Sequence, residues 1–214
     1  MEETKILGEI TRSLAEIDFE ANPQACKEAI DVGIPPKKIV DALSKGMEII
    51  GKRFEVKEYY LVEVIMAGEM FREAQEIIGP YIQKGDIKIP GKIVIGTVEG
   101  DLHDIGKNIL VVLLQSEGFE VTDLGVNVPS NKFIDAVRRD KPDLLGLSAL
   151  LRATVPQMSV IIKELENEGL RNEVKVIVGG LPLNEDYAKK LGADYYAKDA
   201  WLGVETIKKA VKEK

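Results

Sequence analysis

The chain has 214 residues, 45% hydrophobic and 30% charged, a balance typical of a globular protein with one large or two small domains. Its formal charge is −7 and it has no long run of Lys or Arg, which argues against nucleic acid or an anionic membrane surface as a partner. No stretch approaches the roughly 18 apolar residues of a membrane-spanning helix, and the acidic start does not resemble a signal peptide. We therefore expect a cytoplasmic protein. The single cysteine, Cys26, excludes disulfides within the chain and is expected to be a buried thiol.

The first part of the chain has the pattern of a helical bundle. From Thr4 to about Ile82 the apolar residues recur at helical spacing. The interruptions that divide this segment into about four helices are Asn22-Pro23, Gly33 to Pro36, and Phe54 to Lys57. Pro35-Pro36 suits the start of the third helix, and Gly79-Pro80 ends the fourth. We expect a compact four-helix domain over residues 1–88.

The second part has a different hydrophobic pattern. A polar, breaker-rich segment from Lys84 to Gly91 precedes it, so we place the domain boundary between residues 88 and 89. Continuous apolar runs then predict buried parallel strands at Ile93–Ile95, Leu144–Leu147 and Val174–Val178, with shorter strands around Val121 and Tyr195. Because these runs alternate with helical stretches, residues 89–214 are expected to form an α/β domain, a Rossmann-like (flavodoxin-like) doubly wound parallel five-stranded sheet. Ligands of such sheets bind at the carboxyl ends of the strands.

The only histidine, His103, follows the first predicted strand at that binding edge. A neutral imidazole binds a transition metal through one nitrogen, and Asp101, two residues earlier, could accept the proton on the other and orient the ring. Gly106, three residues later, would allow a bulky group to approach the helix start. The alternative is a loop histidine without a ligand, because this pattern is short.

Two further elements fall at the ends of later strands. Ser148 and Leu150 follow the third strand, and Gly179-Gly180 follows the fourth. Taken singly, a loop hydroxyl and a strand-end turn explain them. Taken together with the His103 loop, they face one crevice.

In this order and at these strand ends, these residues resemble the cobalamin-binding domain shared by methionine synthase and the corrinoid proteins of methanogen and acetogen methyltransferases. The resemblance spans the whole second domain, including Gly96 to Ile109 and Phe119 to Gly125. It implies a cobalamin or related corrinoid whose cobalt takes His103 as its lower axial ligand, in place of the cofactor's own dimethylbenzimidazole. Asp101 and Ser148 would continue a hydrogen-bonded relay from this ligand.

The resemblance also implies a slot beside the sheet for the displaced nucleotide tail, with Ser148 and Leu150 on one wall and Gly179-Gly180 leaving space. The implied catalytic residues are His103, Asp101 and Ser148. The implied cofactor-binding residues of this domain are Gly100, Asp101, Leu102, His103, Asp104, Ile105, Gly106, Ser148, Leu150, Gly179 and Gly180.

The first domain resembles the helical cap that precedes the cobalamin domain in the methyltransferase proteins. The residues that carry this likeness are Val32-Gly33, Gly51 to Phe54 and Glu58 to Glu63. The cap would shield the upper cobalt face, with Tyr60, Met66 and Met70 as candidates for covering it. Relatives commonly have Phe-Leu-Pro where this chain has Tyr60-Leu61-Val62. Apolar residues at helical spacing are also what a bundle core requires.

The implied function is a methyl carrier in one-carbon metabolism, whose cobalt alternates between methyl-Co(III) and Co(I). Neither domain has the ~250 residues of a catalytic barrel. The chain would therefore work with a substrate-specific methyltransferase, a second methyltransferase that uses tetrahydrofolate or a thiol as acceptor, and a reductive activator. The Lys84 to Pro90 linker would be the hinge that moves the cap.

Other functions are open at this point. The same domain serves adenosylcobalamin mutases, whose small subunits resemble the second domain alone, and cobalamin-dependent sensors, which add a DNA-binding module that the sequence does not indicate. A phosphate-accepting receiver domain would require an acidic residue where the third strand ends in Ser148. The methyl donor stays open among methanol, methylamines, betaines and aryl methyl ethers, because the partner selects it.

Overall fold

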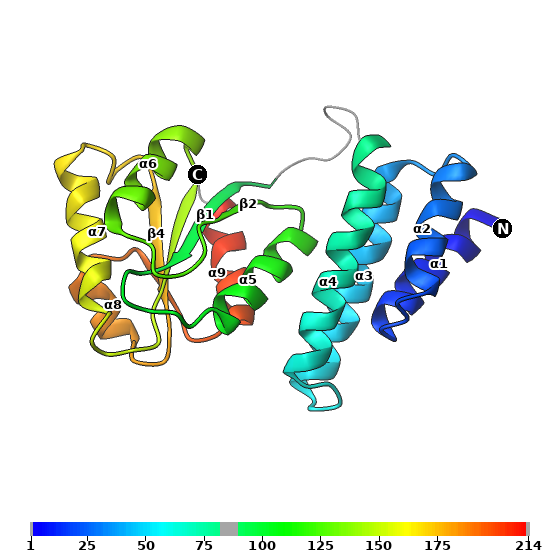
Figure 1. The fold of residues 1–214 in the computed structure, drawn as a ribbon, viewed down its shortest axis with the longest axis horizontal. Coiled ribbons are helices and arrows are strands. Elements are labelled where there is room, and N and C mark those ends of the chain that lie inside the picture. Colours follow the sequence, from blue (N-terminus) through cyan, green and yellow to red (C-terminus); the bar gives the residue numbers. More distant parts are fainter. Residues whose placement is uncertain (1, 82–89, 213–214) are drawn as a thin grey trace. The chain divides into compact units, whose positions relative to one another are not determined.

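The computed structural model describes residues 2–81 and 90–212, which fall into two compact units (Figure 1). The first unit consists of α1–α4, and the second consists of a sheet with α5–α9. The predicted boundary between residues 88 and 89, and most of the predicted hinge from Lys84 to Pro90, lie outside the described residues and stay predictions.

The helical unit has the helices that the apolar periodicity predicts. They are α1 (Glu2–Ala15), α2 (Ala21–Asp31), α3 (Pro36–Glu55) and α4 (Leu61–Ile78), followed by the short 3-10 helix η1 (Gly79–Tyr81). Ile6, Ile10 and Leu14 recur every four residues along α1 and are buried. Gly46 of α3 lies against Leu14, because a Cβ at Gly46 would come within 2.9 Å of the Leu14 side chain. The absence of a side chain at Gly46 therefore lets α1 and α3 pack closely.

A polar contact fixes the end of α3 against the end of α1. The Arg53 guanidinium donates to the carbonyl oxygen of Ala15 at 2.9 Å and to the Tyr59 hydroxyl at 2.7 Å. The Tyr59 hydroxyl in turn donates to the same Ala15 oxygen at 3.0 Å. The loop that leads to Tyr60 and α4 is thereby anchored to the bundle.

The second unit is a doubly wound α/β domain, as predicted. Its strands are β1 (Lys92–Thr97), β2 (Glu120–Asp123), β3 (Leu144–Ser148), β4 (Lys175–Gly179) and β5 (Tyr195–Ala197). They are parallel and lie in the order β2-β1-β3-β4-β5. The helices are α5 (Ile105–Ser116), α6 (Ser130–Asp140), α7 (Pro156–Asn167), α8 (Glu185–Leu191) and α9 (Ala200–Lys212). Figure 1 shows α6, α7 and α8 on one face of the sheet and α5 and α9 on the other.

The pleat of the strands separates a packed face from a ligand-accessible face. Leu145 and Leu147 of β3 belong to a buried core that includes Phe133 of α6 and Met158 of α7. The residue between them, Gly146, faces the α5 and α9 side, because successive side chains in a strand point to opposite faces. Near the carboxyl end of β3 this second face is therefore formed by two small residues, Gly146 and Ser148.

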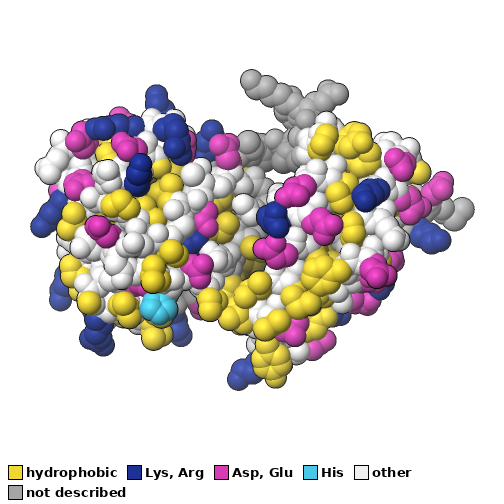
Figure 2. Space-filling view, viewed as in Figure 1, with side chains coloured by type: hydrophobic (Ala, Val, Ile, Leu, Met, Phe, Trp, Pro, Cys, Tyr) yellow, Lys and Arg dark blue, Asp and Glu magenta, His cyan; other side chains and the backbone are white. Residues whose placement is uncertain are grey.

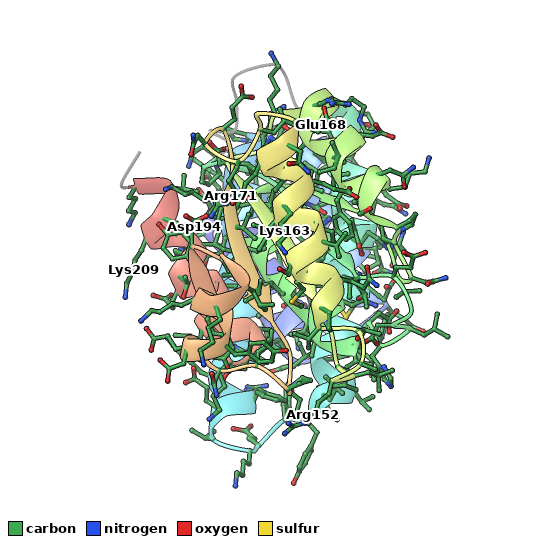
Figure 3. The ribbon with its side chains drawn as sticks, turned by 90° about the vertical axis from the view of Figure 1, so that its left-hand side faces the viewer. Arg152, Lys163, Glu168, Arg171, Asp194 and Lys209 are labelled. Carbon is green, nitrogen blue, oxygen red and sulfur yellow. The ribbon has the colours of Figure 1, made fainter. Side chains whose placement is uncertain are left out.

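An ion pair stabilises the outer edge of the sheet, where β5 lies beside β4. Arg171, beyond the end of α7, lies 2.9 Å from the Asp194 carboxylate and also donates to the Gly192 carbonyl oxygen at 2.9 Å. Figure 3 shows Arg171 and Asp194 near each other, between α7 and α9 in that view. Asp194 also accepts the backbone N–H of Val176 at 2.7 Å, so this pair holds β5 in register beside β4. No helix in the described ranges has the length and apolarity needed to span a membrane.

Candidate functional site

His103 lies in the loop between β1 and α5, at the carboxyl edge of the sheet. Its ring nitrogen Nδ1 is 2.7 Å from Oδ1 of Asp101, and its side chain is 50% exposed. The Asp101 side chain is fully buried. An exposed imidazole is thus held from behind by a buried carboxylate, which is the arrangement that the spacing of the two residues predicted.

Asp101 is surrounded by hydrogen-bond donors. Its Oδ1 also accepts the backbone N–H of His103 at 3.1 Å, while Oδ2 accepts the backbone N–H groups of Leu150 at 2.8 Å and Leu151 at 3.0 Å. The hydroxyl of Thr154 completes the set at 2.8 Å from Oδ2. The carboxylate therefore connects the loop after β1 to the loop after β3.

These contacts determine the charge of Asp101 and the tautomer of His103. Burial acts to raise the pKa of Asp101, but the Leu151 N–H, the His103 ring and the Thr154 hydroxyl outweigh it and hold that pKa well below its usual range. An ionised carboxylate only accepts hydrogen bonds, so Nδ1 of His103 carries the proton. In the neutral imidazole, Nε2 is therefore the nitrogen without a proton and the one able to bind a metal.

A cavity of about 570 Å³ opens beside His103 in the α/β unit. Its walls come from β1, β3, β4, α5 and the start of α9, and its buried members include Ile95, Ile109 and Ile177. The mouth carries exposed apolar side chains, namely Leu102, Ile105, Leu150 and Leu181. Figure 2 shows the imidazole at the surface among hydrophobic side chains. Such a cavity suits a ligand with a large apolar surface.

Three of the four glycines predicted at the site, Gly106, Gly179 and Gly180, have different surroundings. A Cβ at Gly106 would meet nothing within 4 Å, so space is open beside the first turn of α5. Gly180 has φ +137°, and a Cβ there would lie 1.8 Å from the carbonyl oxygen of Ala149. A Cβ at Gly179 would lie 3.3 Å from the Ala197 carbonyl oxygen. At position 180 the backbone conformation and the nearby Ala149 carbonyl oxygen therefore require a glycine, whether or not a ligand binds. Of these three glycines, only Gly106 has no neighbour in the protein that excludes a side chain.

The structure brings nearly all the predicted residues of the α/β unit to this cavity. Those that line it are Leu102, His103, Asp104, Ile105, Gly106, Ser148, Leu150, Gly179 and Gly180. Asp101 lies behind His103, and Gly100 forms the preceding turn with φ +82°. Sequence reasoning therefore located the cavity.

The predicted relay from Asp101 to Ser148 is corrected by the structure. The hydroxyl that donates to the carboxylate is that of Thr154, and Ser148 lines the cavity instead. The reason is the pleat, which puts Ser148 on the same sheet face as Gly146, two residues earlier. Thr154 lies 53 residues from Asp101 in a loop with no periodic pattern, so the sequence offered no signal for this contact.

Sequence reasoning also missed Asn127, which supports the His103 loop from the β2–α6 connection. Its side-chain Oδ1 accepts the Gly100 N–H at 2.7 Å, and its backbone N–H donates to the Asp101 carbonyl oxygen at 2.9 Å. Asn127 has φ 52°, a left-handed conformation that Asn tolerates better than most residues. An Asn between a predicted strand and helix is the only hint that the sequence carries.

The three cap candidates differ in exposure. Tyr60 is exposed at the start of α4, where its backbone N–H donates to the Glu63 carboxylate at 2.8 Å. Met66 is half-buried. Met70 is 2% exposed and shares the buried side of α4 with Phe71 and Ala74. The structure therefore corrects the assignment of Met70 to the cofactor site, since its side chain serves the bundle core.

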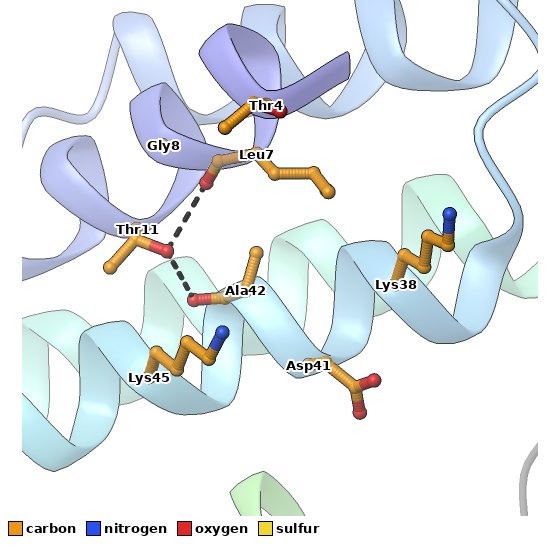
Figure 4. Close-up of a pocket in the computed structure, with 8 residues that line it drawn as sticks. All are labelled: Thr4, Leu7, Gly8, Thr11, Lys38, Asp41, Ala42 and Lys45. Carbon is orange, nitrogen blue, oxygen red and sulfur yellow. Dashed lines mark hydrogen bonds between the residues drawn. The ribbon is translucent and has the colours of Figure 1, made fainter.

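A second cavity, of about 370 Å³, lies between α1 and α3 of the helical unit (Figure 4). Its lining is Thr4, Leu7, Gly8, Thr11, Lys38, Asp41, Ala42 and Lys45. The Thr11 hydroxyl lies 2.9 Å from the Ala42 carbonyl oxygen and 3.2 Å from that of Leu7, so helix backbone already satisfies it. Lys38 pairs with Glu3 at 2.6 Å. This cavity lacks the free ligand atom that His103 gives the first one.

The fold and the His103 site define a cofactor-binding protein of the doubly wound α/β class with an added helical unit. Residues 91–204 match the family model of the B12 binding domain, and residues 6–78 match a second model with that description. Trimethylamine corrinoid protein 2 of Methanosarcina acetivorans is 35% identical over 211 residues, 97% of each chain. Dimethylamine corrinoid protein 3 of that organism is 42% identical over 168 residues, 78% of this chain and 79% of that protein. The chain therefore belongs to the B12-binding family of corrinoid proteins.

Solved structures agree with this assignment. A cobalamin-binding protein from Desulfitobacterium hafniense DCB-2 is 34% identical, with a TM-score of 0.75 over 95% of this chain and 98% of that chain. The methanol:cobalamin methyltransferase complex of Methanosarcina barkeri contains a chain that is 26% identical, with a TM-score of 0.88 over 98% of this chain and 81% of that chain. The expected family and the expected corrinoid cofactor are confirmed.

The residues at the His103 site fit a corrinoid. Within the described ranges, no group of three or more His, Cys, Asp or Glu side chains could hold a metal ion by itself. A single imidazole is instead a suitable donor for a metal whose other ligands come from its own macrocycle. The apolar mouth and the open space at Gly106 offer room for such a macrocycle.

Proposed function

We propose that the chain binds a corrinoid with His103 as the lower axial ligand of cobalt, and that it carries a methyl group between two methyltransferases. The observation that carries this proposal is the 2.7 Å contact between His103 Nδ1 and the buried Asp101 carboxylate, at the mouth of the 570 Å³ cavity. When bound, the corrinoid supplies the cobalt that accepts and releases the methyl group.

Asp101 orients the ligand and keeps it in the binding tautomer. Its ionised carboxylate accepts the hydrogen bond of the Nδ1–H group of His103, so the lone pair of Nε2 is free for the metal. Leu150, Leu151 and Thr154 hold the carboxylate in place through three donors to Oδ2. A ligand oriented in this way loses little entropy on binding a metal.

The cavity beside the sheet would accept the displaced nucleotide tail. Ser148 and Leu150 line one wall, and the backbone turn at Gly179-Gly180 lines another. Gly106 lies at the first turn of α5, where a side chain has open space, so a bulky ligand could approach there. The apolar buried walls would exclude water from the tail.

The helical unit would serve as a cap for the upper face of the corrinoid. Tyr60, at the exposed start of α4, and the half-buried Met66 are the residues proposed to contribute to that cover. An exposed apolar surface on a helical unit suits a cover that must also release its ligand to a partner.

Two methyltransferases and a reductive activator are the proposed partners, one methyltransferase loading the methyl group and the other transferring it to tetrahydrofolate or a thiol. Relatives with 35% and 42% identity are named trimethylamine and dimethylamine corrinoid proteins. A methylamine is therefore the first methyl donor to test, with methanol second because of the similar chain in the methanol:cobalamin complex.

The proposal is tested by loading the apoprotein with hydroxocobalamin under anaerobic conditions, removing free cofactor and reducing the cobalt to Co(II). Wild-type protein should show a paramagnetic resonance spectrum with nitrogen splitting from one imidazole, and His103→Ala should lose that splitting. Lys163→Ala, on the α7 surface shown in Figure 3, is the control and should retain it. Failure of the wild-type protein to retain any corrinoid would reject the proposal.

A further inference from the structure

Lys107 is a buried charge that the proposed function does not use. Among the described residues, Asp101 and Lys107 are the charged residues that are buried, and the Lys107 side chain is 1% exposed. It projects from the first turn of α5, four residues after His103. Removing an ammonium group from water is unfavourable unless it is paired and hydrogen-bonded.

The partners of Lys107 belong to two different elements. Its Nζ donates to Oδ2 of Asp123, the last residue of β2, at 2.6 Å. It also donates to the side-chain Oδ1 of Asn108, its neighbour in α5, at 2.5 Å. The lysine therefore ties the start of α5 to the end of β2.

From both partners, further hydrogen bonds lead to the backbone around His103. On the α5 side, the Asn108 side-chain amide donates to Oδ2 of Asp104 at 3.0 Å, and Asp104 directly follows His103. The Asn108 backbone N–H also donates to the Asp104 carbonyl oxygen at 2.7 Å. Asp104 is thus held at both its side chain and its backbone.

On the β2 side, Oδ1 of Asp123 accepts the Gly125 N–H at 2.9 Å. The Gly125 carbonyl oxygen accepts the N–H of Thr97 at 2.9 Å, and the Thr97 hydroxyl donates to the His103 carbonyl oxygen at 3.1 Å. The two branches therefore end on adjacent residues, one at the His103 carbonyl oxygen and the other at the side chain and carbonyl oxygen of Asp104, with Lys107 in the middle.

From this closed path we infer that Lys107, with Asp123, is a positioning residue for the metal ligand His103. Asp101 orients the imidazole ring, whereas the Lys107–Asp123 pair fixes the backbone from which the ring projects. The inference rests on the proposed role of His103 as ligand, but it concerns a different part of the chain. Loosening contacts that orient a metal ligand typically weakens metal binding by about 10–100-fold.

The test must separate positioning from simple stability. Lys107→Met leaves Asp123 unpaired, and Asp123→Leu leaves a buried ammonium unpaired, so both single variants are expected to be destabilised. The double variant Lys107→Met/Asp123→Leu removes both charges together, and its unfolding midpoint in urea should return close to that of the wild type. The matched control is Lys92→Met, because Lys92 pairs with Glu120 at 3.1 Å between β1 and β2 at the opposite, exposed end of the strands.

Each protein is loaded with hydroxocobalamin and reduced to Co(II), and the fraction with imidazole nitrogen splitting is measured across a pH series. The double variant should lose imidazole ligation by about tenfold or more, which moves the pH midpoint of ligation upward by about one unit. Lys92→Met should match the wild type. If the double variant is not folded, Asp123→Asn supplies the comparison, since the side chain is 33% exposed and the amide has one acceptor oxygen where the carboxylate uses two, so it loses the contact to either Lys107 or Gly125.

A folded double variant, or Asp123→Asn in its place, with the wild-type splitting and pH midpoint would overturn the inference and leave Lys107 with a structural role. Failure of the proposed function has a different signature, because wild-type protein would then show no imidazole splitting at any pH. The two outcomes are therefore distinguishable in one series.

Discussion

The Thr154 hydroxyl donates to Oδ2 of Asp101 at 2.8 Å, across 53 residues of sequence. Both side chains are buried, and the contact joins the loop before α7 to the loop that carries His103. Thr154 contacts Oδ2 of the carboxylate, whereas the His103 ring contacts the other oxygen, Oδ1. One oxygen of Asp101 therefore serves the candidate ligand and the other serves the fold.

Replacing Thr154 with Val removes the hydroxyl while keeping the branched shape. Because hydrogen bonds to buried charged groups contribute about 1.5–3 kcal/mol, Thr154→Val should lower the free energy of unfolding by about that amount. Urea denaturation of the apoprotein at pH 7 measures the change. Thr154→Ser retains the hydroxyl and is the control. Equal losses in the two variants would show that packing of the methyl group, and not the hydrogen bond, stabilises this loop.

The contrasting glycines of the site give a second prediction. Gly180→Ala forces a Cβ against the Ala149 carbonyl oxygen at φ +137°, so it should destabilise the fold by about 2–4 kcal/mol. Gly106→Ala adds a methyl group in open space within the first turn of α5, and should leave stability unchanged or raise it by up to about 1 kcal/mol. Thermal unfolding of the apoproteins measures both.

Retention of hydroxocobalamin by the folded Gly106→Ala protein then shows whether the corrinoid occupies the open space beside this glycine. If the open space beside this glycine is occupied by the corrinoid, Gly106→Ala should bind the cofactor more weakly while remaining fully folded. Unchanged retention in a stable Gly106→Ala protein would show that the corrinoid does not approach this turn.

Asn127 supplies a third prediction, because its backbone and its side chain act separately. Asn127→Gly keeps the left-handed conformation and loses only the hydrogen bond to the Gly100 N–H, so it should cost about 0.5–1.5 kcal/mol. Asn127→Ala also places a side chain without a stabilising amide at φ 52°, which adds about 1–2 kcal/mol.

The three unfolding free energies, measured by urea denaturation, should therefore decrease in the order wild type, Asn127→Gly, Asn127→Ala. Lys141, at the end of α6, has φ 46° without such a side-chain contact in the described residues, and Lys141→Gly should instead stabilise the protein slightly. Equal destabilisation by both Asn127 variants would assign the whole effect to the side chain.

The sequence located the sheet and the site because their signals are local. Continuous apolar runs marked the strands, and the spacing of Asp101, His103 and Gly106 marked the loop at their carboxyl edge. The parts that it could not supply depend on contacts distant in sequence. Thr154 is an ordinary loop hydroxyl until the fold brings it to Asp101.

Two side chains show how local patterns mislead about burial. Lys107 lies near the start of an amphipathic helix, where a lysine is normally exposed, yet Asp123 and Asn108 stabilise it in a buried position. Met70 lies at helical spacing that fits either a core or a cofactor cover, and its packing in α4 decides for the core. Exposure of a helical residue is set by neighbouring elements, which periodicity alone does not specify.

Cys26 gives the last prediction, a dependence of stability on pH. Burial, with a smaller contribution from Glu73, raises the pKa of the Cys26 thiol from its ordinary value of 9.0 to about 12. The folded state therefore keeps the proton at pH values where the unfolded chain loses it. The unfolded state then binds fewer protons, so stability falls as the pH rises from about 9 toward 12, by up to about 1.4 kcal/mol per pH unit.

Cys26→Ala has no thiol to titrate, so it is the control for the pH dependence of the wild type. At pH 7 the variant should be less stable by roughly 1 kcal/mol, because it leaves a small cavity in the bundle. Between pH 9 and 10.5 the difference should shrink and then reverse, since only the wild type loses the thiol contribution. Urea denaturation at pH 7, 8.5, 9.5 and 10.5 follows both proteins while the lysines and tyrosines titrate equally in each. Parallel curves would mean that the thiol ionises as readily in the folded chain as in the unfolded one, contrary to its burial in α2.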